Sequence, residues 1–447
     1  SRELNWFLNQ SGAVALIMLS KIRGQDFLAG IRADSPELSE QQPFALDSPA
    51  LPELKTVITI DGETEGAIAS WSDFMNRNSL YSEEALLDAQ ASVNPEDICY
   101  ILYTSGSTAS PKGVMLAHKG VIENGFDIGE RQHLTEKDRL WLAVPLFWSF
   151  GSANALPAIM THGGTIVLQE SFDADRALTI IRSQRCTVFY GMANMVRALK
   201  ASSYWSNDAV ETMRTGLTIG LPEDVAFIIE TLKAHELCNV YGSTETYGNA
   251  TVCDAFDSLE QRLNSQGKPL PGMDVQILDR DTREILPSGV IGEIAIKGHV
   301  TVGYYLEPEM TVSTFHNDFF LSGDLGCLDQ DGRLYFKGRF KEMIKTGGIN
   351  VAPLEVEGIL VAHPMIKQAY VVGVFDHVKE EKVVAVVVYE EGEQESEKDL
   401  REFCREELAS YKVPEYIVSY QEINLPLTST GKINKLKLKD ELSMKLD

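Results

Sequence analysis

The chain lacks the usual signals of metal centres, disulfide frameworks and membrane segments. Its six cysteines are scattered with no Cys-x-x-Cys pair, and its eight histidines include no His-Glu-x-x-His motif. We therefore predict free thiols in a reducing cytosol and a cytoplasmic location. No apolar run approaches the roughly 18 residues of a membrane helix, and residues 1–6 are unlike a signal peptide, so we expect no membrane span.

Basic residues are scarce. Forty lysines and arginines face 65 aspartates and glutamates, which gives a net charge of −25. This charge would repel a phosphate backbone, so we expect no nucleic-acid partner. Any bound nucleotide must be held by local donors and a metal ion. The chain also has no initiator methionine and opens in a helix-like pattern at residues 2–10, so we expect that an upstream segment is absent.

The most informative segment, residues 103–113, has the features of a loop that holds polyphosphate. Gly106 and Gly113 let backbone amides approach an anion, several hydroxyls can donate hydrogen bonds, and Lys112 adds a positive charge. The apolar run 98–103 before it predicts a buried strand. The segment is not a Walker A loop, because its lysine follows proline and precedes glycine. A flexible surface turn is the alternative interpretation.

The rest of the chain predicts an α/β protein with two parts. Up to residue 337, helical and strand patterns alternate, as in a layered α/β body, and residues 270–300 alternate apolar with polar side chains, as in a barrel-like antiparallel subdomain. A boundary is expected at 338–341, followed by a small α+β domain over 342–447. The expected strands are 98–103, 140–144, 165–168, 187–190, 368–374 and 383–389, and the expected helices are 173–183, 224–234, 353–362 and 397–408.

Four further segments contain residue types that suit nucleotide chemistry. After the apolar run 237–240, a glycine turn presents Glu245, and one carboxylate beside phosphates is enough to hold Mg²⁺, although a capped turn is the simpler interpretation. Asp324 and Arg339 could bind ribose or phosphate. A double glycine lies within residues 345–350, and Lys432 follows a glycine turn near the C-terminus.

Taken in order and spacing, these five segments resemble the adenylate-forming superfamily, and most closely its acyl-CoA ligases. The resemblance runs from before residue 98 to residue 438. It implies a large N-terminal domain with a small mobile lid. The implied reaction is ATP-dependent activation of a carboxylic acid to an acyl-adenylate with release of pyrophosphate, then transfer of the acyl group to the thiol of CoA. ATP, Mg²⁺ and CoA are the implied cofactors.

The resemblance also implies roles for individual residues. Tyr241, next to Gly242, would stack on adenine, with the turn Gly220-Leu221-Pro222 along the edge of the base. The α-phosphate would contact Thr244, and Mg²⁺ would bind to Glu245. The β- and γ-phosphates would be held by Thr104, Ser105, Gly106, Ser107, Thr108, Lys112 and Gly113.

Further implied roles involve the lid. Asp324 would hold the ribose hydroxyls, with Arg339 close by, and Lys341 would be the hinge. Lys432 would bridge the substrate carboxylate and the α-phosphate during adenylation. The pantetheine tunnel would be flanked by Gly347, Gly348 and Asn350.

The resemblance narrows the substrate as well. Trp148 stands where peptide-synthetase adenylation domains have aspartate, which disfavours an α-amino acid. Residues 347–353 look like the acyl-CoA ligase form. The expected acyl pocket is apolar, with Arg197 only at its edge, and this predicts a hydrophobic monocarboxylate, aliphatic or aryl. The side chains expected to line this pocket are Phe147, Trp148, Phe150, Phe189, Tyr190, Met192, Met195 and Tyr247. We expect about half of them simply to belong to the hydrophobic core.

Two alternatives stay open at this point. The enzyme could load its acyl group onto the phosphopantetheine of an acyl carrier protein instead of CoA. From another class, the chain could be a nucleotide-binding module without catalytic activity.

Overall fold

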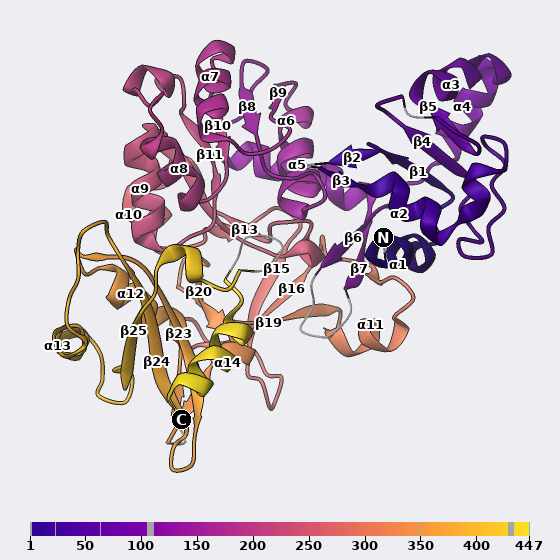
Figure 1. Cartoon of the computed structure of the whole chain (residues 1–447). Coiled ribbons are helices and arrows are strands. Elements are labelled where there is room, and N and C mark those ends of the chain that lie inside the picture. Colours follow the sequence, from indigo (N-terminus) through magenta and orange to yellow (C-terminus); the bar gives the residue numbers. More distant parts are fainter. Residues whose placement is uncertain are drawn as a thin grey trace. The chain divides into compact units, whose positions relative to one another are not determined.

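The computed structural model describes residues 2–22, 24–62, 64–104, 111–347, 349–427 and 433–446 (Figure 1). The chain divides into two compact units. One comprises residues 1–118 with 304–306, and the other comprises residues 119–303 with 307–447. Within the described ranges, no helix is long and apolar enough to cross a membrane.

The first unit is built on a small parallel sheet of order β1-β4-β5. Asp26 starts the helix beneath it, because its carboxylate accepts the N–H of Ala29 at 2.8 Å. Leu28, Ile31 and Val57 belong to the buried core between helix and sheet. The predicted opening helix is confirmed. The elements are α1 (Arg2–Ser11), β1 (Ala15–Met18), α2 (Phe27–Asp34), β4 (Thr56–Thr59) and β5 (Ile68–Ser70).

The predicted polyphosphate loop lies between two strands of a hairpin in this unit. β6 (Ile98–Thr104) pairs antiparallel with β7 (Lys112–Ala117), and Thr104 lies opposite Lys112. The expectation of a buried strand is wrong here, because β6 pairs as a hairpin and its residues are half-buried or exposed. Residues 105–110 lie outside the described part of the chain.

The second unit contains a seven-stranded sheet of order β14-β13-β12-β11-β10-β8-β9. Strands β8 to β12 are parallel, so the loops after them emerge at one edge, where α/β proteins bind ligands. The strands are β8 (Arg139–Leu142), β9 (Thr165–Leu168), β10 (Val188–Tyr190), β11 (Thr215–Thr218), β12 (Glu236–Tyr241), β13 (Thr251–Val252) and β14 (Lys268–Pro269).

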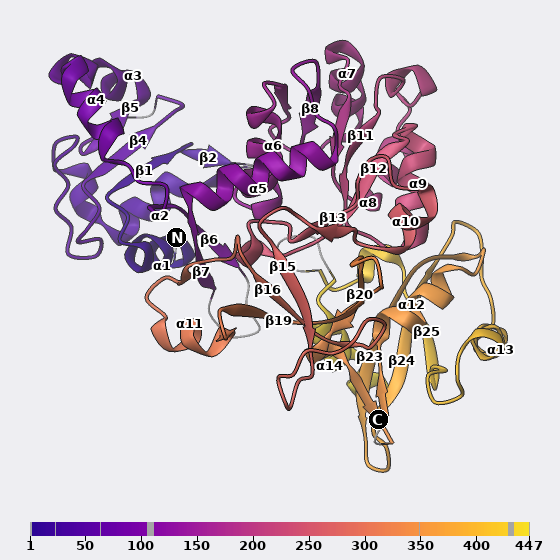
Figure 2. The ribbon, with the colours of Figure 1, turned by 180° about the vertical axis from the view of Figure 1, so that it is seen from behind.

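Helices cover this sheet, and local sequence explains where several of them begin and end. Asp173 caps α7 by accepting the N–H of Arg176, and the helix ends at Arg185 in the left-handed conformation. Pro222 occupies the first turn of α9. Figure 2 shows α5 beside α6. The helices are α5 (His118–Arg131), α6 (Leu156–Thr161), α7 (Ala174–Gln184), α8 (Ala193–Ala201), α9 (Pro222–Leu232) and α10 (Leu259–Asn264), and a π-helical turn, η3 (Phe150–Ala155), leads directly into α6.

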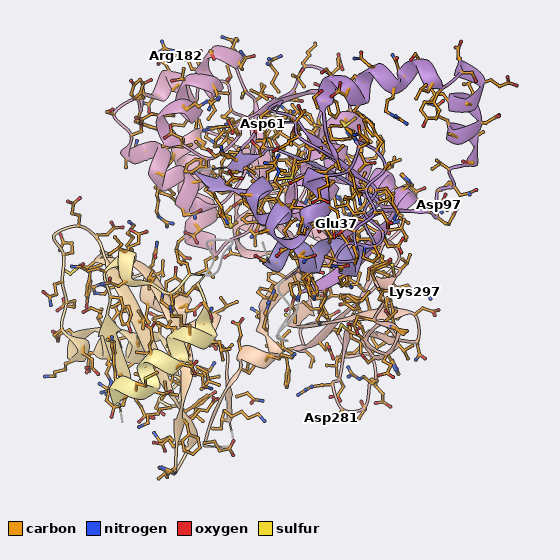
Figure 3. The ribbon with its side chains drawn as sticks, turned by 45° about the vertical axis from the view of Figure 1, so that its right-hand side comes forward. Glu37, Asp61, Asp97, Arg182, Asp281 and Lys297 are labelled. Carbon is orange, nitrogen blue, oxygen red and sulfur yellow. The ribbon has the colours of Figure 1, made fainter. Side chains whose placement is uncertain are left out.

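The predicted antiparallel subdomain is a five-stranded sheet in the same unit. Its order is β15-β16-β19-β18, with β20 pairing with β19. In Figure 3, Asp281 marks the turn between β15 and β16, and Lys297 the end of β16. Arg182, also labelled there, belongs to α7. The strands are β15 (Asp274–Leu278), β16 (Gly292–Lys297), β18 (Phe315–His316), β19 (Phe319–Leu328) and β20 (Leu334–Arg339).

The C-terminal region has a sheet of its own, of order β22-β21-β24-β23 with β25 beside β24. Two hydrophobic core clusters lie in this region, one that includes Leu400 and one that includes Leu438. The predicted domain boundary at 338–341 stays a prediction. The elements are β21 (Ile344–Thr346), β22 (Ile349–Val351), α12 (Pro353–Val361), β23 (Ile366–Asp376), β24 (Glu380–Tyr389), α13 (Glu397–Glu407), β25 (Tyr416–Ser419) and α14 (Lys435–Leu446).

We expect residues 342–447 to fold as an isolated fragment, because both of these clusters draw all their residues from it. Calorimetry should show a single cooperative transition. Leu400→Ala should lower the free energy of unfolding by about 2–5 kcal/mol, since Leu400 is fully buried. Leu436→Ala is the matched control, because Leu436 is exposed. A fragment whose unfolding shows no cooperative transition would contradict the predicted domain boundary at 338–341.

Candidate functional site

A buried hydrogen bond joins the end of β12 to the middle of β19 in the second unit. Tyr241, the last residue of β12, donates its hydroxyl to Asp324 Oδ2 at 2.9 Å. Its ring stacks on Phe336 of β20, with centroids 5.6 Å apart. Arg339 lies opposite Asp324 in the β19–β20 pair, and its Nε is 3.6 Å from Asp324 Oδ1. The structure thus brings together the three residues predicted to bind adenosine.

The environment of Asp324 changes its acidity. Burial raises the pKa of this carboxyl above the ordinary value, although Arg339 and the Tyr241 hydroxyl act in the opposite direction. Arg339 itself is largely exposed, so solvent weakens its influence. Burial also raises the pKa of Tyr241 far above its usual range, and the phenol therefore stays a hydrogen-bond donor. A carboxylate beside an exposed guanidinium suits a nucleotide, because the carboxylate can accept hydrogen bonds from ribose hydroxyls and the guanidinium can bind phosphate.

The residues predicted to contact the α-phosphate and Mg²⁺ lie on a short turn after β12. Thr244 and Glu245 belong to a 3₁₀ turn, η5 (Thr244–Thr246), which Thr246 Oγ1 closes by accepting the N–H of Ser243 at 2.9 Å. The Glu245 carbonyl accepts the N–H of Thr301 at 2.6 Å. Thr244 Oγ1 donates to Ser149 Oγ at 3.2 Å. This last bond links the turn to residues 146–151, here called the acyl motif, which include Phe147, Trp148 and Phe150 of the expected acyl pocket.

The residues around Glu245 fit a magnesium ion shared with phosphates. Among the described residues, no three His, Cys, Asp or Glu side chains gather at a metal-binding spacing. A closed protein cage is therefore not seen in that part of the chain. Mg²⁺ usually takes one or two carboxylates and obtains its other oxygens from phosphate and water. Half-buried Glu245 can supply the protein ligand, and when bound the ion would neutralise phosphate charge.

The turn predicted to run along the adenine edge follows β11. Leu221 precedes α9 in an extended conformation, and Pro222 begins the helix. A side chain at Gly220 would meet Asp224 Cβ at 3.0 Å, so this position has little room. Thr218, at the end of β11, has a buried hydroxyl that finds no hydrogen-bond partner within the described part of the chain. The strand end therefore retains hydrogen-bonding capacity beside this turn.

The acyl motif combines exposed and half-buried aromatic side chains. Phe147 is 70% exposed, whereas Trp148 and Phe150 are half-buried against one core layer of the sheet. Tyr190 is fully buried in that layer, with its ring 5.3 Å from that of Phe150, and its hydroxyl accepts from Gln132 Nε2 at 2.8 Å. Met192, half-buried, lies just before α8.

One expected pocket residue lies on the opposite face of the sheet. Phe189 stacks on Trp141 and belongs to the other core layer, as does Met195. Successive residues of a strand point to opposite faces, so Phe189 cannot share a pocket with Tyr190. The expectation for Phe189 is corrected accordingly, whereas the expectation for Met195, a half-buried residue of α8, stays a prediction.

Helix α5 supplies contacts that the motifs did not indicate. Tyr247 is buried and has a positive φ of 55°, and its ring lies directly on Gly120 of α5. Asn124 lies four residues after Gly120 on the same helix, and its Nδ2 donates to the carbonyl of Asn249 at 3.1 Å. The spacing of four residues places Gly120 and Asn124 on one face of the helix, but it does not indicate which segment packs there.

The lid residues are described in part. Lys341 lies in the 3₁₀ turn η6 (Phe340–Glu342), Gly347 has a positive φ of 57°, and Asn350 lies in β22. In the first unit, Lys112 Nζ lies 5.3 Å from the ring centroid of Tyr304. Several predicted residues fall outside the described part of the chain, namely Ser105, Gly106, Ser107, Thr108, Gly348 and Lys432.

Comparison with known proteins decides the family. A model described as AMP-binding enzyme matches residues 1–306, and one described as AMP-binding enzyme C-terminal domain matches residues 355–432. The chain belongs to the AMP-binding enzymes. It is 32% identical to a putative acyl-CoA synthetase, YngI, of Bacillus subtilis, over 99% of this chain and 81% of that protein. It is also 32% identical to the mitochondrial medium-chain acyl-CoA ligase ACSF2 of Mus musculus, over 100% and 74%.

Solved structures agree with this assignment. ATP-bound MatB from Rhodopseudomonas palustris is 27% identical, with a TM-score of 0.80 over 100% of this chain and 82% of that one. The anthranilate CoA ligase AuaEII in complex with anthranoyl-AMP is 26% identical, with a TM-score of 0.81 over 100% and 81%. The predicted fold class is confirmed. So is the enzyme class, an AMP-forming acid–thiol ligase that uses ATP, Mg²⁺ and CoA.

Asp324 gives this AMP-binding enzyme a testable pH dependence. The raised pKa means that protons neutralise Asp324 at a higher pH than an ordinary aspartate. We expect KM for ATP to rise as the pH falls through that pKa. The variant Asp324→Asn should have a high KM for ATP at every pH, without this rise. Ionisation of Asp324 opposes folding at neutral pH, so the variant's free energy of unfolding should be unchanged or slightly higher. An identical pH profile in the variant would contradict the role.

Gly120 should be intolerant of a side chain. An added Cβ would lie 2.3–2.8 Å from atoms of the Tyr247 ring. Gly120→Ala should therefore lower the free energy of unfolding by about 1–3 kcal/mol, measured by denaturant titration. Gly358→Ala is the matched helical control, because nothing lies within 4 Å of its Cβ, and it should be neutral or stabilising by about 0.5–1 kcal/mol. Equal stability of both variants would disprove the tight contact.

Proposed function

We propose that this enzyme activates a hydrophobic monocarboxylic acid, aliphatic or aryl, as an acyl-adenylate and then transfers the acyl group to CoA. The hydrogen bond from Thr244 to Ser149, at 3.2 Å, is the observation that carries the proposal. Thr244 belongs to the turn proposed to contact the α-phosphate, and Ser149 belongs to the acyl motif. A carboxylate held by that motif would therefore lie next to the phosphorus atom that it attacks.

The chemistry follows from this placement. A carboxylate oxygen attacks the α-phosphorus, and the bond to the oxygen that bridges to the β-phosphate breaks, so pyrophosphate leaves. The thiolate of CoA then attacks the acyl carbon and AMP leaves. Both steps bring anions together, so catalysis depends on positioning and charge neutralisation. Lys432, Lys112 and the magnesium ligand Glu245 are the proposed groups, and Lys341 is the proposed hinge of the lid.

Two features support a hydrophobic monocarboxylate. The half-buried aromatic side chains Trp148 and Phe150 belong to the acyl motif. The nearest cation proposed from the sequence, Arg197, is already paired with Asp224 through a bond of 2.7 Å. A second carboxylate on the substrate would need an available cation, because an unpaired buried charge is strongly unfavourable. Arg197 is therefore a poor candidate for that role.

ATP–pyrophosphate exchange over a panel of aliphatic and aryl acids tests the proposal. We expect exchange with hydrophobic monocarboxylates, then thioester formation with CoA. If the acyl group were transferred only to a holo-carrier protein, that protein and not CoA would be the acceptor. Exchange with none of the acids would instead support a nucleotide-binding module without activity.

The cytoplasmic location stays a prediction, and fractionation of the source cells tests it.

Lys432 should act in only one half-reaction. We expect Lys432→Ala to reduce adenylation by at least about a hundredfold, because a charge-neutralising group in the transition state is lost. Thiolysis of a supplied acyl-adenylate should continue at nearly the normal rate, as measured by thioester formation. Lys437→Ala is the control, because Lys437 is an exposed lysine of the nearby α14. Equal loss of both half-reactions would count against a rotating lid.

A further inference from the structure

Three fully buried asparagines meet at the segment that follows Glu245. Asn124 comes from α5, Asn154 from the π-helical turn η3, and Asn249 from the segment itself. Asn124 Nδ2 donates to the carbonyls of residues 246, 247 and 249, at 3.4, 3.4 and 3.1 Å. Asn154 packs on Gly248, where an added Cβ would lie 3.1 Å from its Cβ and 3.3 Å from its Nδ2.

Most of the amide atoms in this cluster have no hydrogen-bond partner among the residues that the structure describes. Both amide atoms of Asn154 and of Asn249 are buried and unpaired, and so is Asn124 Oδ1. Asn124 therefore supports the segment with its nitrogen, whereas the other two side chains support nothing through their amides. Buried side-chain polar atoms are nearly always paired in proteins, so unpaired atoms gathered in one place require an explanation. A ligand group that donates and accepts would satisfy them.

The cluster lies inside the elements that we propose to form the acyl pocket. Asn154 is four residues after Phe150 on η3, and Asn249 is two residues after Tyr247. A π-helical turn is rare and is found mainly at functional sites. All three side chains are neutral. They suit a hydroxyl, carbonyl or carboxamide, whereas a second carboxylate would need a cation that asparagine does not supply.

We propose that the acid activated by this enzyme bears a neutral hydrogen-bonding group away from its carboxylate, and that Asn154 and Asn249 recognise that group. The inference rests on the proposed function and refines it. The substrate then has an apolar body against Trp148 and Phe150 and a polar group at the asparagines. Asn154 and Asn249 are specificity-determining residues, and Asn124 positions the segment on which Asn249 lies.

Matched pairs of acids test this proposal in the intact enzyme. Exchange is measured with hexanoic and ω-hydroxyhexanoic acid, octanoic and ω-hydroxyoctanoic acid, and benzoic acid with its meta- and para-hydroxy derivatives. In at least one pair, kcat/KM for the hydroxy acid should exceed that for its parent by about tenfold or more, because a site that bonds a hydroxyl rejects the analogue lacking it. A wholly apolar pocket would favour every parent acid, since an unpaired buried hydroxyl is unfavourable.

Asn154→Leu should reverse the preference, because leucine has a similar size and no polar atoms. Asn264→Leu, at an exposed position of α10, is the matched control and should retain it. If Asn154→Leu fails to fold, Asn249→Ser and the wild-type preference still decide the question. Preference of the wild type for every parent acid would overturn the proposal but leave the adenylation reaction standing. Exchange with no acid at all would overturn the proposed function as well.

Discussion

The hydrogen bond from Tyr241 to Asp324 is the contact on which the candidate site depends. Tyr241 ends a strand of the seven-stranded sheet, and Asp324 lies in the antiparallel sheet, so one buried bond ties the two sheets together. Hydrogen bonds to charged groups contribute about 1.5–3 kcal/mol. The pairing of Asp324 with Arg339 then sets where β20 ends, and Lys341 follows two residues later. The same bond thus lies among the residues proposed to bind adenosine, of which Arg339 stands two residues before the proposed hinge.

Burial of the ionised Asp324 carboxylate carries a cost in stability. A carboxylate taken out of water is less easily ionised, which is why its pKa rises despite two favourable partners. An ionised acceptor is nevertheless what ribose hydroxyls bind most strongly. In a chain with a net charge of −25, a buried carboxylate close to a polyphosphate would repel it without nearby cations. Under the proposed function, Arg339 and a magnesium ion held by Glu245 would together offset this repulsion.

The sequence was most informative where chemistry needs particular residue types. A glycine turn with hydroxyls and charge after a strand marked Glu245, an aspartate directly after a glycine marked Asp324, and apolar periodicity marked most strands of the parallel sheet. Burial was harder to predict, because a short apolar run such as residues 98–103 is compatible with a fully buried strand and with a half-buried strand of a hairpin. The face of Phe189 depended on strand register, which motif spacing does not contain.

The residues missed by sequence reasoning share a physical reason. Gly120 and Asn124 act on Tyr247 and Asn249 across more than a hundred residues, and nothing in an unremarkable helix pattern indicates such partners. Contacts of this kind arise only when the fold brings α5 beside the segment after β12. Under the proposed function, they also separate two tasks within one site. The turn at Thr244 and Glu245 would handle ATP for any acid, whereas the side chains packed against its far end would belong to the elements that meet the acyl group. Substrate choice could then change through Asn154 or Trp148 while the geometry around the α-phosphate stays the same.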